Sequence, residues 1–389
     1  MTKANKGPRT DALTPVFSNS VGAEELARVA DVFQSGWLGK GQECDAFEAE
    51  FAAMLDAPQS LLFNCCTSAI FISLRALGIG KGDEVIISTV NFVACASAVI
   101  DCGAVPVFAD VDPHSLNILP AEVARLRTPR TRAVIILHYG GHPSDMEGLR
   151  DVCGDKIMII EDSANSVSSS YRGEMCGTLG EAGFFSFDAM KILVMGDGGA
   201  LVMRDQEAHR RATSLRYLGY PDRTSSGMAA MSSKSAKRWW EYEVQAVSGR
   251  YISNDIMAAI GRVQLKKLPS FILRRRAIWQ LYQEALADIA PLTRPPEPLE
   301  GCSSSYYLYW IQIPSLRDEL AAYLAENGVY TTFRYFPLHK VSFFADGNHL
   351  PNAEAVNETT LNLPIHQNLT DDEVLWIADL VASFVATRL

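Results

Sequence analysis

The chain has 389 residues, of which 48% are hydrophobic and 21% are charged, and its formal net charge is −10. This length exceeds what one small hydrophobic core usually organises, so we expect an ordinary globular protein of two domains. The acidic balance disfavours a nucleic-acid partner, which requires a basic surface, although a local basic pocket on an acidic protein can still bind an anionic substrate.

The first residues and the cysteines predict a cytoplasmic location. Residues 1–15 contain neither the apolar core nor the cleavage pattern of a secretory signal. No run approaches the roughly eighteen apolar residues of a membrane-spanning helix, so we expect no membrane partner. The eight cysteines include no C-x-x-C pair, which favours free thiols in a reducing cytosol over disulfides or a metal site.

The first part of the chain alternates between helical patterns and short apolar runs. Residues 24–55 have a helical pattern that a glycine-rich turn interrupts at 36–41. The strands predicted after it are 60–63, 84–88, 105–109, 132–138, 156–160, 183–187 and 199–203. The helices predicted among them are 67–77, 92–102, 144–153 and 206–217. This alternation predicts an α/β fold, with a mostly parallel sheet covered by helices on both faces and ligands bound beyond the carboxyl ends of its strands.

The last part of the chain predicts a long loop, a long helix and a smaller unit. A polar stretch at 224–235 is expected to be a loop. An amphipathic helical pattern covers 254–286, and we expect a kink near Pro269. The prolines between 291 and 298 indicate a linker into a smaller α+β unit. The predicted division is a tail at 1–15, a large domain at 16–245 and a C-terminal domain at 246–389.

One lysine and one aspartate give the most specific chemical signal. Lys191 follows the apolar run 183–187 and precedes the turn Gly-Asp-Gly-Gly at 196–199, while Asp162 follows the buried strand predicted at 156–160. These are the two groups that a pyridoxal 5′-phosphate (PLP) enzyme needs, because the lysine forms the Schiff base and the acid keeps the pyridine nitrogen protonated. The sequence therefore predicts a PLP site at the ends of these strands.

Lys191 is also the predicted base that moves a proton between the substrate carbon and the cofactor carbon. Burial and a neighbouring cationic ring are expected to lower its pKa towards ~7–8, which suits a base that works near neutrality. An arbitrary lysine is far more often a surface residue of a loop. The flanking apolar run and glycine-rich turn favour the functional interpretation here.

Four further residues are candidates for binding the cofactor. Thr67 opens a helix after a strand, where its hydroxyl and the backbone N–H groups can hold a phosphate, and Ser186 can add a second hydroxyl. Phe92 can stack on the cofactor ring, and Asn165 can hydrogen-bond its hydroxyl. Each signal is weak alone, because a threonine N-cap, a core phenylalanine and a turn asparagine have the same signatures.

Three motifs together resemble the sugar aminotransferases of the DegT/DnrJ/EryC1/StrS family, which are fold-type I PLP enzymes. They are G-x-G-x-G-D-E-V-I at 78–86, E-D-x-A-x at 161–165 and S-F-x-x-x-K followed by G-D-G-G at 186–199. The resemblance extends from Val16 to the C-terminus. It implies a seven-stranded mixed sheet, a smaller C-terminal α/β domain, and a homodimer with active sites at the subunit interface.

The resemblance assigns roles to individual residues. It implies that Lys191 carries the cofactor, that Asp162 meets the pyridine nitrogen, that Asn165 lies near the ring hydroxyl and that Phe92 stacks on the ring. The phosphate ligands implied in the same way are Cys66, Thr67 and Ser186.

Three departures from the family pattern matter for the site. Cys66 stands where many members have glycine, which a backbone N–H contact tolerates. An asparagine of the partner subunit usually reaches the phosphate, and here either Arg250 or Asn254 could replace it. Many members have His-Tyr-x-Pro-x-His where this chain has Arg334 and His339. We expect Arg334 to bind an anionic group, either a nucleotide diphosphate or the carboxylate of the amino donor.

The substrate is expected to contact Arg334, His339 and a second group of residues at the end of the predicted loop. Aromatic and guanidinium side chains suit a nucleotide base and a diphosphate. The second group of predicted substrate contacts is Arg238, Trp239 and Trp240.

The resemblance is greatest to actinobacterial members from antibiotic sugar pathways. It implies transamination of dTDP-4-keto-6-deoxyglucose to dTDP-4-amino-4,6-dideoxyglucose, with L-glutamate as donor and pyridoxamine phosphate as the intermediate form of the cofactor. The alternatives within the family are a C3 keto-sugar or a cyclitol aminotransferase, because no motif fixes the position. A dehydratase relative would have histidine in place of Lys191, and a non-catalytic regulatory relative would have lost the lysine or the acid.

Overall fold

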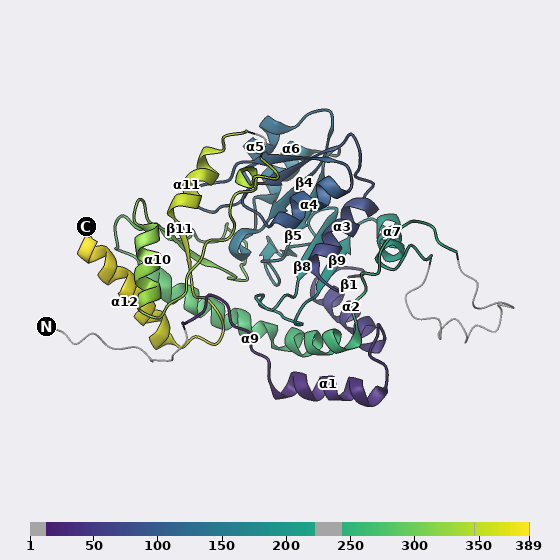
Figure 1. The fold of residues 1–389 in the computed structure, drawn as a ribbon, viewed down its shortest axis with the longest axis horizontal. Coiled ribbons are helices and arrows are strands. Elements are labelled where there is room, and N and C mark those ends of the chain that lie inside the picture. The colour runs from purple at the N-terminus through teal and green to yellow at the C-terminus, as the bar shows by residue number, and fades with distance from the viewer. Residues whose placement is uncertain (1–12, 222–242, 346, 389) are drawn as a thin grey trace.

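A seven-stranded sheet forms the centre of the molecule (Figure 1). The computed structural model describes residues 13–221, 243–345 and 347–388. The strands of the sheet are β1 (Leu61–Phe63), β2 (Glu84–Ser88), β3 (Val105–Ala109), β4 (Thr131–Leu137), β5 (Met158–Asp162), β8 (Ala182–Ser186) and β9 (Gly199–Met203). Their order is β1-β9-β8-β5-β4-β2-β3, and β9 is antiparallel to both neighbours whereas the other pairs are parallel. The predicted α/β fold with a mostly parallel seven-stranded sheet is confirmed.

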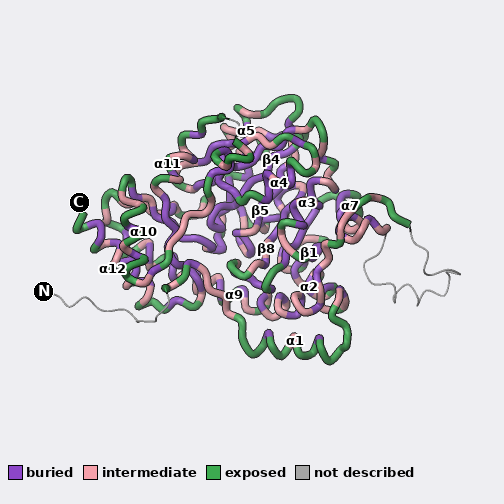
Figure 2. Tube along the Cα trace, viewed as in Figure 1, coloured by how far each residue is buried: buried purple, intermediate pink, exposed green. Residues whose placement is uncertain are grey.

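Successive residues of the central strands pack against opposite helical layers. The helices beside the sheet are α3 (Cys66–Ala76), α4 (Val93–Asp101), α5 (Pro120–Leu126), α6 (Met146–Cys153) and α7 (Gln206–Arg216). In β4, Ile135 belongs to the apolar cluster that contains α3 and α4, whereas Val134 and Ile136 belong to the cluster that contains α5 and α6. Both faces of the sheet are therefore buried, as the purple centre of Figure 2 shows, and its strands are apolar on both sides.

Most predicted elements are present with shifts of one or two residues at their ends, and a few short ones were missed. β5 continues through Asp162 because its last residues pair with β4 and β8, whereas the sequence predicted an end at residue 160. The sequence predicted neither the short helix α5 nor the hairpin of β6 (Ser170–Tyr171) and β7 (Glu174–Met175). These elements are too short for their residue pattern to identify them.

Three helices pack together on one side of the sheet. α1 (Ala23–Ser35) and α2 (Gln42–Met54) both contact the long helix α9 (Asp255–Ala285), which continues through Pro269 and reaches the C-terminal helices (Figure 1). Asp255 at the start of α9 accepts hydrogen bonds from the backbone N–H groups of Gly41 at 2.8 Å and Cys44 at 3.1 Å. This carboxylate therefore satisfies the free N–H groups at the start of α2.

The C-terminal residues form a separate apolar cluster with part of α9. Its elements are α10 (Arg317–Glu326), α12 (Asp371–Arg388) and a two-stranded antiparallel sheet of β10 (Tyr309–Gln312) and β11 (Thr360–Leu363). The helix before β11, α11 (Pro351–Thr359), packs instead with the apolar cluster that contains α3 and α4. The exact division into domains at 245/246 stays a prediction. Among the helices of the described ranges, none is both long enough and apolar enough to span a membrane.

Candidate active site

Lys191 lies in the connection between β8 and β9. A backbone hydrogen bond of 3.0 Å from Phe187 N to Gly198 O joins the two ends of this connection. Lys191 Nζ donates to Asn165 Oδ1 at 3.3 Å and lies 4.7 Å from the centre of the Tyr307 ring. The connection thus holds the amine near the carboxyl ends of β5 and β8, where a parallel sheet binds its ligands.

Asp162 is a buried carboxylate at the end of β5. It is 3% exposed, and it accepts hydrogen bonds from Ala164 N at 3.1 Å and from the Cys95 thiol at 3.5 Å. Burial raises the pKa of this carboxyl, and the Ala164 N–H and the Lys191 ammonium oppose the rise. Asp162 is buried near Lys191 and forms no ion pair with any described residue, which suits an exchangeable cationic partner.

Glu161 has a structural task on the opposite face of β5. Ser144 N donates to His138 Nδ1, so the other ring nitrogen of His138 carries the proton and donates to Glu161 at 3.0 Å. The carboxylate also accepts three backbone hydrogen bonds of 2.6–2.7 Å, from Gly177, Leu179 and Gly180. All of these groups are buried, so Glu161 fixes the segment before β8 and is not available to a ligand.

The protein alone does not lower the pKa of Lys191. Burial acts to lower it, but Tyr307, Tyr335 and Asp162 outweigh burial, so this pKa lies above its usual range. Tyrosines carry charge only in alkaline solution, which leaves the Asp162 carboxylate as the group that favours the ammonium at neutral pH. The predicted lowering depends on the cationic ring of the bound cofactor, so it stays a prediction.

The start of α3 lies directly beside the start of β9. A Cβ atom added to Gly199 would lie 2.5 Å from Cys66 Cα, so only glycine permits this approach. Ser186 pairs with Gly199 across the sheet, which brings Ser186 to the same edge as Cys66 and Thr67. The side chain of the N-cap residue of α3, Cys65, lies 3.3 Å from the Ser68 hydroxyl and makes no capping hydrogen bond to the backbone N–H groups of the helix.

Residues of the C-terminal part lie against the Lys191 connection. The guanidinium carbon of Arg334 lies 4.5 Å from the centre of the Phe17 ring, and Arg334 Nη2 lies 3.0 Å from Met190 Sδ. The Tyr335 ring lies 5.9 Å from the ring of Phe92, which is 50% exposed. Arg334 and Phe92 are thus near Lys191, as the sequence predicted for substrate and cofactor contacts.

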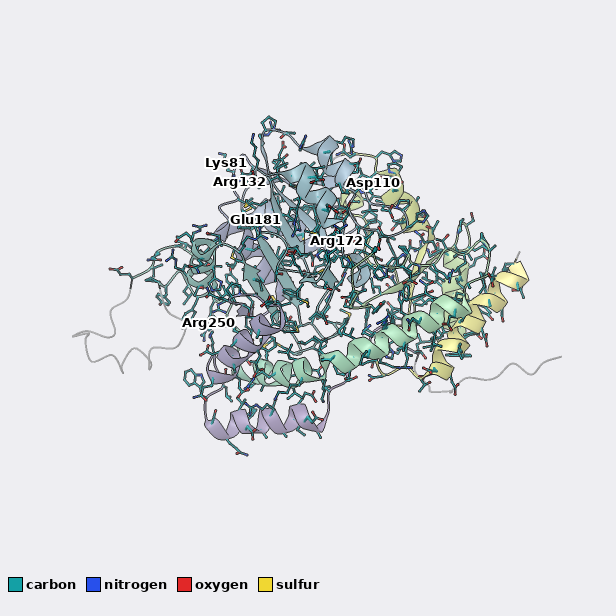
Figure 3. The ribbon with its side chains drawn as sticks, turned by 180° about the vertical axis from the view of Figure 1, so that it is seen from behind. Lys81, Asp110, Arg132, Arg172, Glu181 and Arg250 are labelled. Atoms are coloured by element: carbon teal, nitrogen blue, oxygen red, sulfur yellow. The ribbon has the colours of Figure 1, made fainter. Side chains whose placement is uncertain are left out.

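Arg250 and Asn254 stand just before α9. Arg250 is exposed and is labelled in Figure 3, and its guanidinium lies 5.7 Å from the centre of the Tyr217 ring. Asn254 is the N-cap of α9, and its side-chain oxygen accepts from Met257 N at 3.0 Å. Both residues therefore stay candidates for the phosphate ligand.

The remaining predicted substrate contacts are less favourably placed or lie outside the described residues. His339 is 4% exposed; its Nδ1 lies 2.7 Å from Thr89 Oγ1 and its Nε2 lies 3.3 Å from Glu354 Oε1. Both ring nitrogens are thus engaged within the protein. The residues that fall outside the described ranges are Arg238, Trp239 and Trp240.

Several residues of this region carried no usable sequence signal. Tyr307 and Phe17 stack with ring centres 5.3 Å apart, and Tyr307 lies below the lysine amine. Cys95 donates to Asp162 from α4. Tyr335 could have been noticed, because it belongs to the segment in which Arg334 departs from the family pattern. In the described part of the chain, no group of three or more histidine, cysteine or acidic side chains could hold a metal ion.

Comparison with known proteins identifies the family. The model of the DegT/DnrJ/EryC1/StrS aminotransferase family matches residues 19–382. The chain belongs to this family. The predicted family and the predicted aminotransferase activity are therefore confirmed, and family membership gives the enzyme a sugar substrate and an amino donor.

Three similar proteins agree with this assignment. A dTDP-4-dehydro-2,3,6-trideoxy-D-glucose 4-aminotransferase of Saccharopolyspora spinosa is 46% identical over 92% of this chain and 93% of its own length. The structure of aminotransferase TlmJ from Streptoalloteichus hindustanus matches with a TM-score of 0.91 at 45% identity, over 97% of this chain and 100% of the other. A structure described as a sugar aminotransferase of Streptococcus pneumoniae in its PMP form matches with a TM-score of 0.89 at 25% identity, over 96% and 100%.

Proposed function

We propose that this enzyme transfers an amino group from L-glutamate to C4 of dTDP-4-keto-6-deoxyglucose, giving dTDP-4-amino-4,6-dideoxyglucose for a deoxyaminosugar pathway. Its cofactor is PLP. The observation that carries the proposal is the placement of Lys191 and the buried Asp162 at neighbouring strand ends, in a chain 46% identical to a 4-aminotransferase that acts on a dTDP-linked 4-keto sugar. When bound, PLP supplies an electron sink that stabilises negative charge on the carbon bearing the amine.

The residues at these strand ends fit PLP. The buried Asp162 carboxylate matches a protonated pyridine nitrogen. Asn165 Nδ2 is fully buried and has no hydrogen-bond partner among the described residues, so it can donate to the ring hydroxyl. Phe92, half exposed at the start of α4, offers a face for the ring.

The phosphate group fits the start of α3. Backbone N–H groups there have no capping side chain, and Thr67 and Ser186 add hydroxyl groups on the same edge of the sheet. Burial and the nearby Asp162 raise the pKa of the Cys66 thiol well above its usual range. Cys66 therefore stays uncharged and does not repel the phosphate.

Lys191 is the proposed proton carrier. Asn165 holds its amine by one hydrogen bond, and the Tyr307 ring supports it from below, so the amine has few directions in which to move. Tyr307, Tyr335 and Asp162 raise the pKa of Lys191, and a cationic cofactor ring would neutralise the contribution of Asp162. The amine can then act as a base near neutral pH.

We also propose a homodimer in the cytoplasm. The segment before α9 lies beside the start of α3, where the phosphate is proposed to bind, because Asn64 N donates to Tyr251 O at 2.8 Å. In the proposed dimer, Arg250 or Asn254 completes the phosphate site of the partner subunit. All eight cysteines are free thiols, which suits a reducing compartment. The nucleotide-binding roles of Arg238, Trp239 and Trp240, and the substrate contact of His339, stay predictions.

A product assay tests the proposed reaction. The holoenzyme is incubated with L-glutamate and dTDP-4-keto-6-deoxyglucose, and the product is identified by NMR; the 2,3,6-trideoxy analogue serves as a second substrate because a relative uses it. An amine at C4 supports the proposal. Acceptance of a 3-keto isomer instead of the 4-keto sugar would keep the transaminase chemistry and move the reaction to C3.

The role of Lys191 has an independent test. The visible absorption band of the bound cofactor should be bleached by borohydride, and Lys191→Ala should lose this bleachable band while keeping its fold by circular dichroism. A Lys191→Ala protein that retained both the band and the turnover would refute the assignment.

A further inference from the structure

Arg334 differs in its partners from four other arginines that are partly or fully buried. Arg216, Arg262 and Arg274 each pair with a carboxylate, and the buried Arg275 donates to three backbone carbonyl groups. Within the described ranges, Arg334 has no carboxylate within ion-pair distance.

Within the described ranges, the Arg334 guanidinium hydrogen-bonds two uncharged side chains, the Met190 thioether and Tyr335. Arg334 Nη2 lies 3.0 Å from the thioether of Met190. A guanidinium has five N–H donors, and a thioether sulfur accepts hydrogen bonds weakly. The group therefore retains donors and charge for a ligand.

The position of this guanidinium is fixed relative to Lys191. The Arg334 backbone N–H donates at 2.9 Å to Asn362 Oδ1, which belongs to a fully buried residue. The guanidinium lies on the Phe17 ring, Phe17 stacks on Tyr307, and the Tyr307 ring lies below the Lys191 amine. Met190, which the guanidinium contacts, is the residue before Lys191. These contacts preorganise the cation beside the reacting amine, which lowers the cost of binding an anion.

The two substrates of a transaminase differ in where they carry negative charge. An amino-acid donor carries its α-carboxylate one bond from the carbon at which Lys191 acts. A nucleotide sugar carries its diphosphate at C1, so the sugar ring separates that charge from a carbonyl at C4. A planar guanidinium next to the reacting amine therefore matches the donor, because it can bind a carboxylate through two parallel hydrogen bonds.

We propose that Arg334 binds the α-carboxylate of the amino donor and thereby selects an amino acid for the first half of the reaction. This inference rests on the proposed transaminase function. The sequence predicted that Arg334 binds either the donor carboxylate or the nucleotide diphosphate, and this inference selects the carboxylate.

The test separates the two half-reactions of the holoenzyme. The PLP form is mixed with L-glutamate and the PMP form with the keto sugar, and the change in cofactor absorbance gives the rate and the apparent KM of each half. We expect Arg334→Gln to raise the KM for glutamate roughly 10- to 100-fold, as for the loss of charged hydrogen bonds, and to leave the KM for the keto sugar within about twofold. Arg334→Lys should recover part of the loss.

A binding measurement complements the kinetics. Calorimetric titration of the holoenzyme with glutarate, which cannot react, should show weaker binding to Arg334→Gln than to the unmodified enzyme. Arg132→Gln is the matched control, because Arg132 is exposed near the amino end of β4, away from the strand ends that carry Lys191, and is labelled in Figure 3. It should leave both half-reactions unchanged.

Two outcomes would overturn the inference without touching the proposed function. One is a raised KM for the keto sugar with normal glutamate kinetics, which would assign Arg334 to the diphosphate. The other is no change in either half-reaction. By contrast, failure of the unmodified holoenzyme to react with any pair of amino acid and keto sugar would refute the transaminase function itself.

Discussion

Glu161 and Asp162 are adjacent in β5, and their carboxylates lie on opposite faces of the sheet. Asp162 contacts Cys95 of α4, whereas Glu161 contacts His138 and the segment before β8. Successive side chains of a strand alternate between faces, so two neighbouring acids acquire unrelated tasks. One is placed for the cofactor and the other holds the fold.

Replacing the structural acid should affect stability rather than chemistry. Glu161→Gln leaves one acceptor oxygen for four buried donors, so we expect the free energy of unfolding to fall by about 2–4 kcal/mol. Urea unfolding measures this change. Below the new unfolding transition, the turnover number should stay within a few-fold of the original, and a large loss of turnover in a stable protein would contradict the structural role.

Replacing the other acid should have the reverse effect. Asp162→Asn keeps the shape of a buried side chain whose charged form is disfavoured by burial, so the free energy of unfolding should not fall. The cofactor loses its anionic partner, and we expect turnover to fall by a factor on the order of 10²–10³. Steady-state kinetics and a urea titration of the same sample measure both. An active Asp162→Asn enzyme would show that the carboxylate is dispensable.

The Tyr307 ring, not its hydroxyl, is expected to support Lys191. Tyr307 is fully buried and no described residue hydrogen-bonds its hydroxyl, so Tyr307→Phe should leave the free energy of unfolding unchanged or raise it by up to about 1 kcal/mol. Tyr307→Ala removes the ring from a packed site and should lower it by about 3–5 kcal/mol. Thermal and urea unfolding of the two variants distinguish these roles. A Tyr307→Phe variant as unstable as Tyr307→Ala would mean that the hydroxyl has a partner.

Two buried histidines should make the protein sensitive to mild acid. Burial lowers the pKa of His142 to about 4, and burial and Arg275 lower that of His366 to about 4. Between these values and the ordinary histidine value near 6.5, the unfolded chain binds more protons than the folded one, so stability falls as the pH falls through this window. We expect a loss on the order of 2–3 kcal/mol per histidine from pH 6.5 to 4.

Urea unfolding at several pH values measures this dependence. Carboxylates also titrate near pH 4, so the control is His142→Phe, which keeps an aromatic ring beside Trp310 and removes one titrating group. Its pH dependence should be weaker than that of the unmodified protein between pH 6.5 and 5. An unchanged slope would mean that His142 does not bear the predicted penalty.

The sheet could be predicted from sequence because its strands are buried on both faces. Runs such as 84–88 and 199–203 are bounded by glycine or polar residues, and their predicted ends agree with β2 and β9. The end of β5 was missed because Glu161 and Asp162 are charged. Their hydrogen-bond partners offset the cost of burying two carboxylates in a strand. The sequence around residues 161 and 162 does not show which distant residues will be these partners.

The site was predictable only where strand ends and motifs coincide. Lys191, Asp162 and Asn165 follow from the glycine-rich turn and the acid at a strand end, and the structure brings them together. Phe17 and Tyr307 were out of reach, because they come to Lys191 from segments 174 residues before and 116 residues after it, a difference read from their numbering. No periodicity links positions so far apart.

The cap that Asp255 places on α2 has a consequence for how the chain is made. Asp255 lies 214 residues after Gly41, so α1 and α2 emerge during synthesis long before the helix they pack against. Phe47 and Phe51 of α2 can already pack against Phe185 and Phe187, but the sides of α1 and α2 that contact α9 stay uncovered until α9 is complete. A fragment that ended near residue 245 would contain the seven strands of the central sheet but would lack α9, the helix that packs against α1 and α2. Synthesis must therefore pass residue 285 before α1 and α2 can complete their packing.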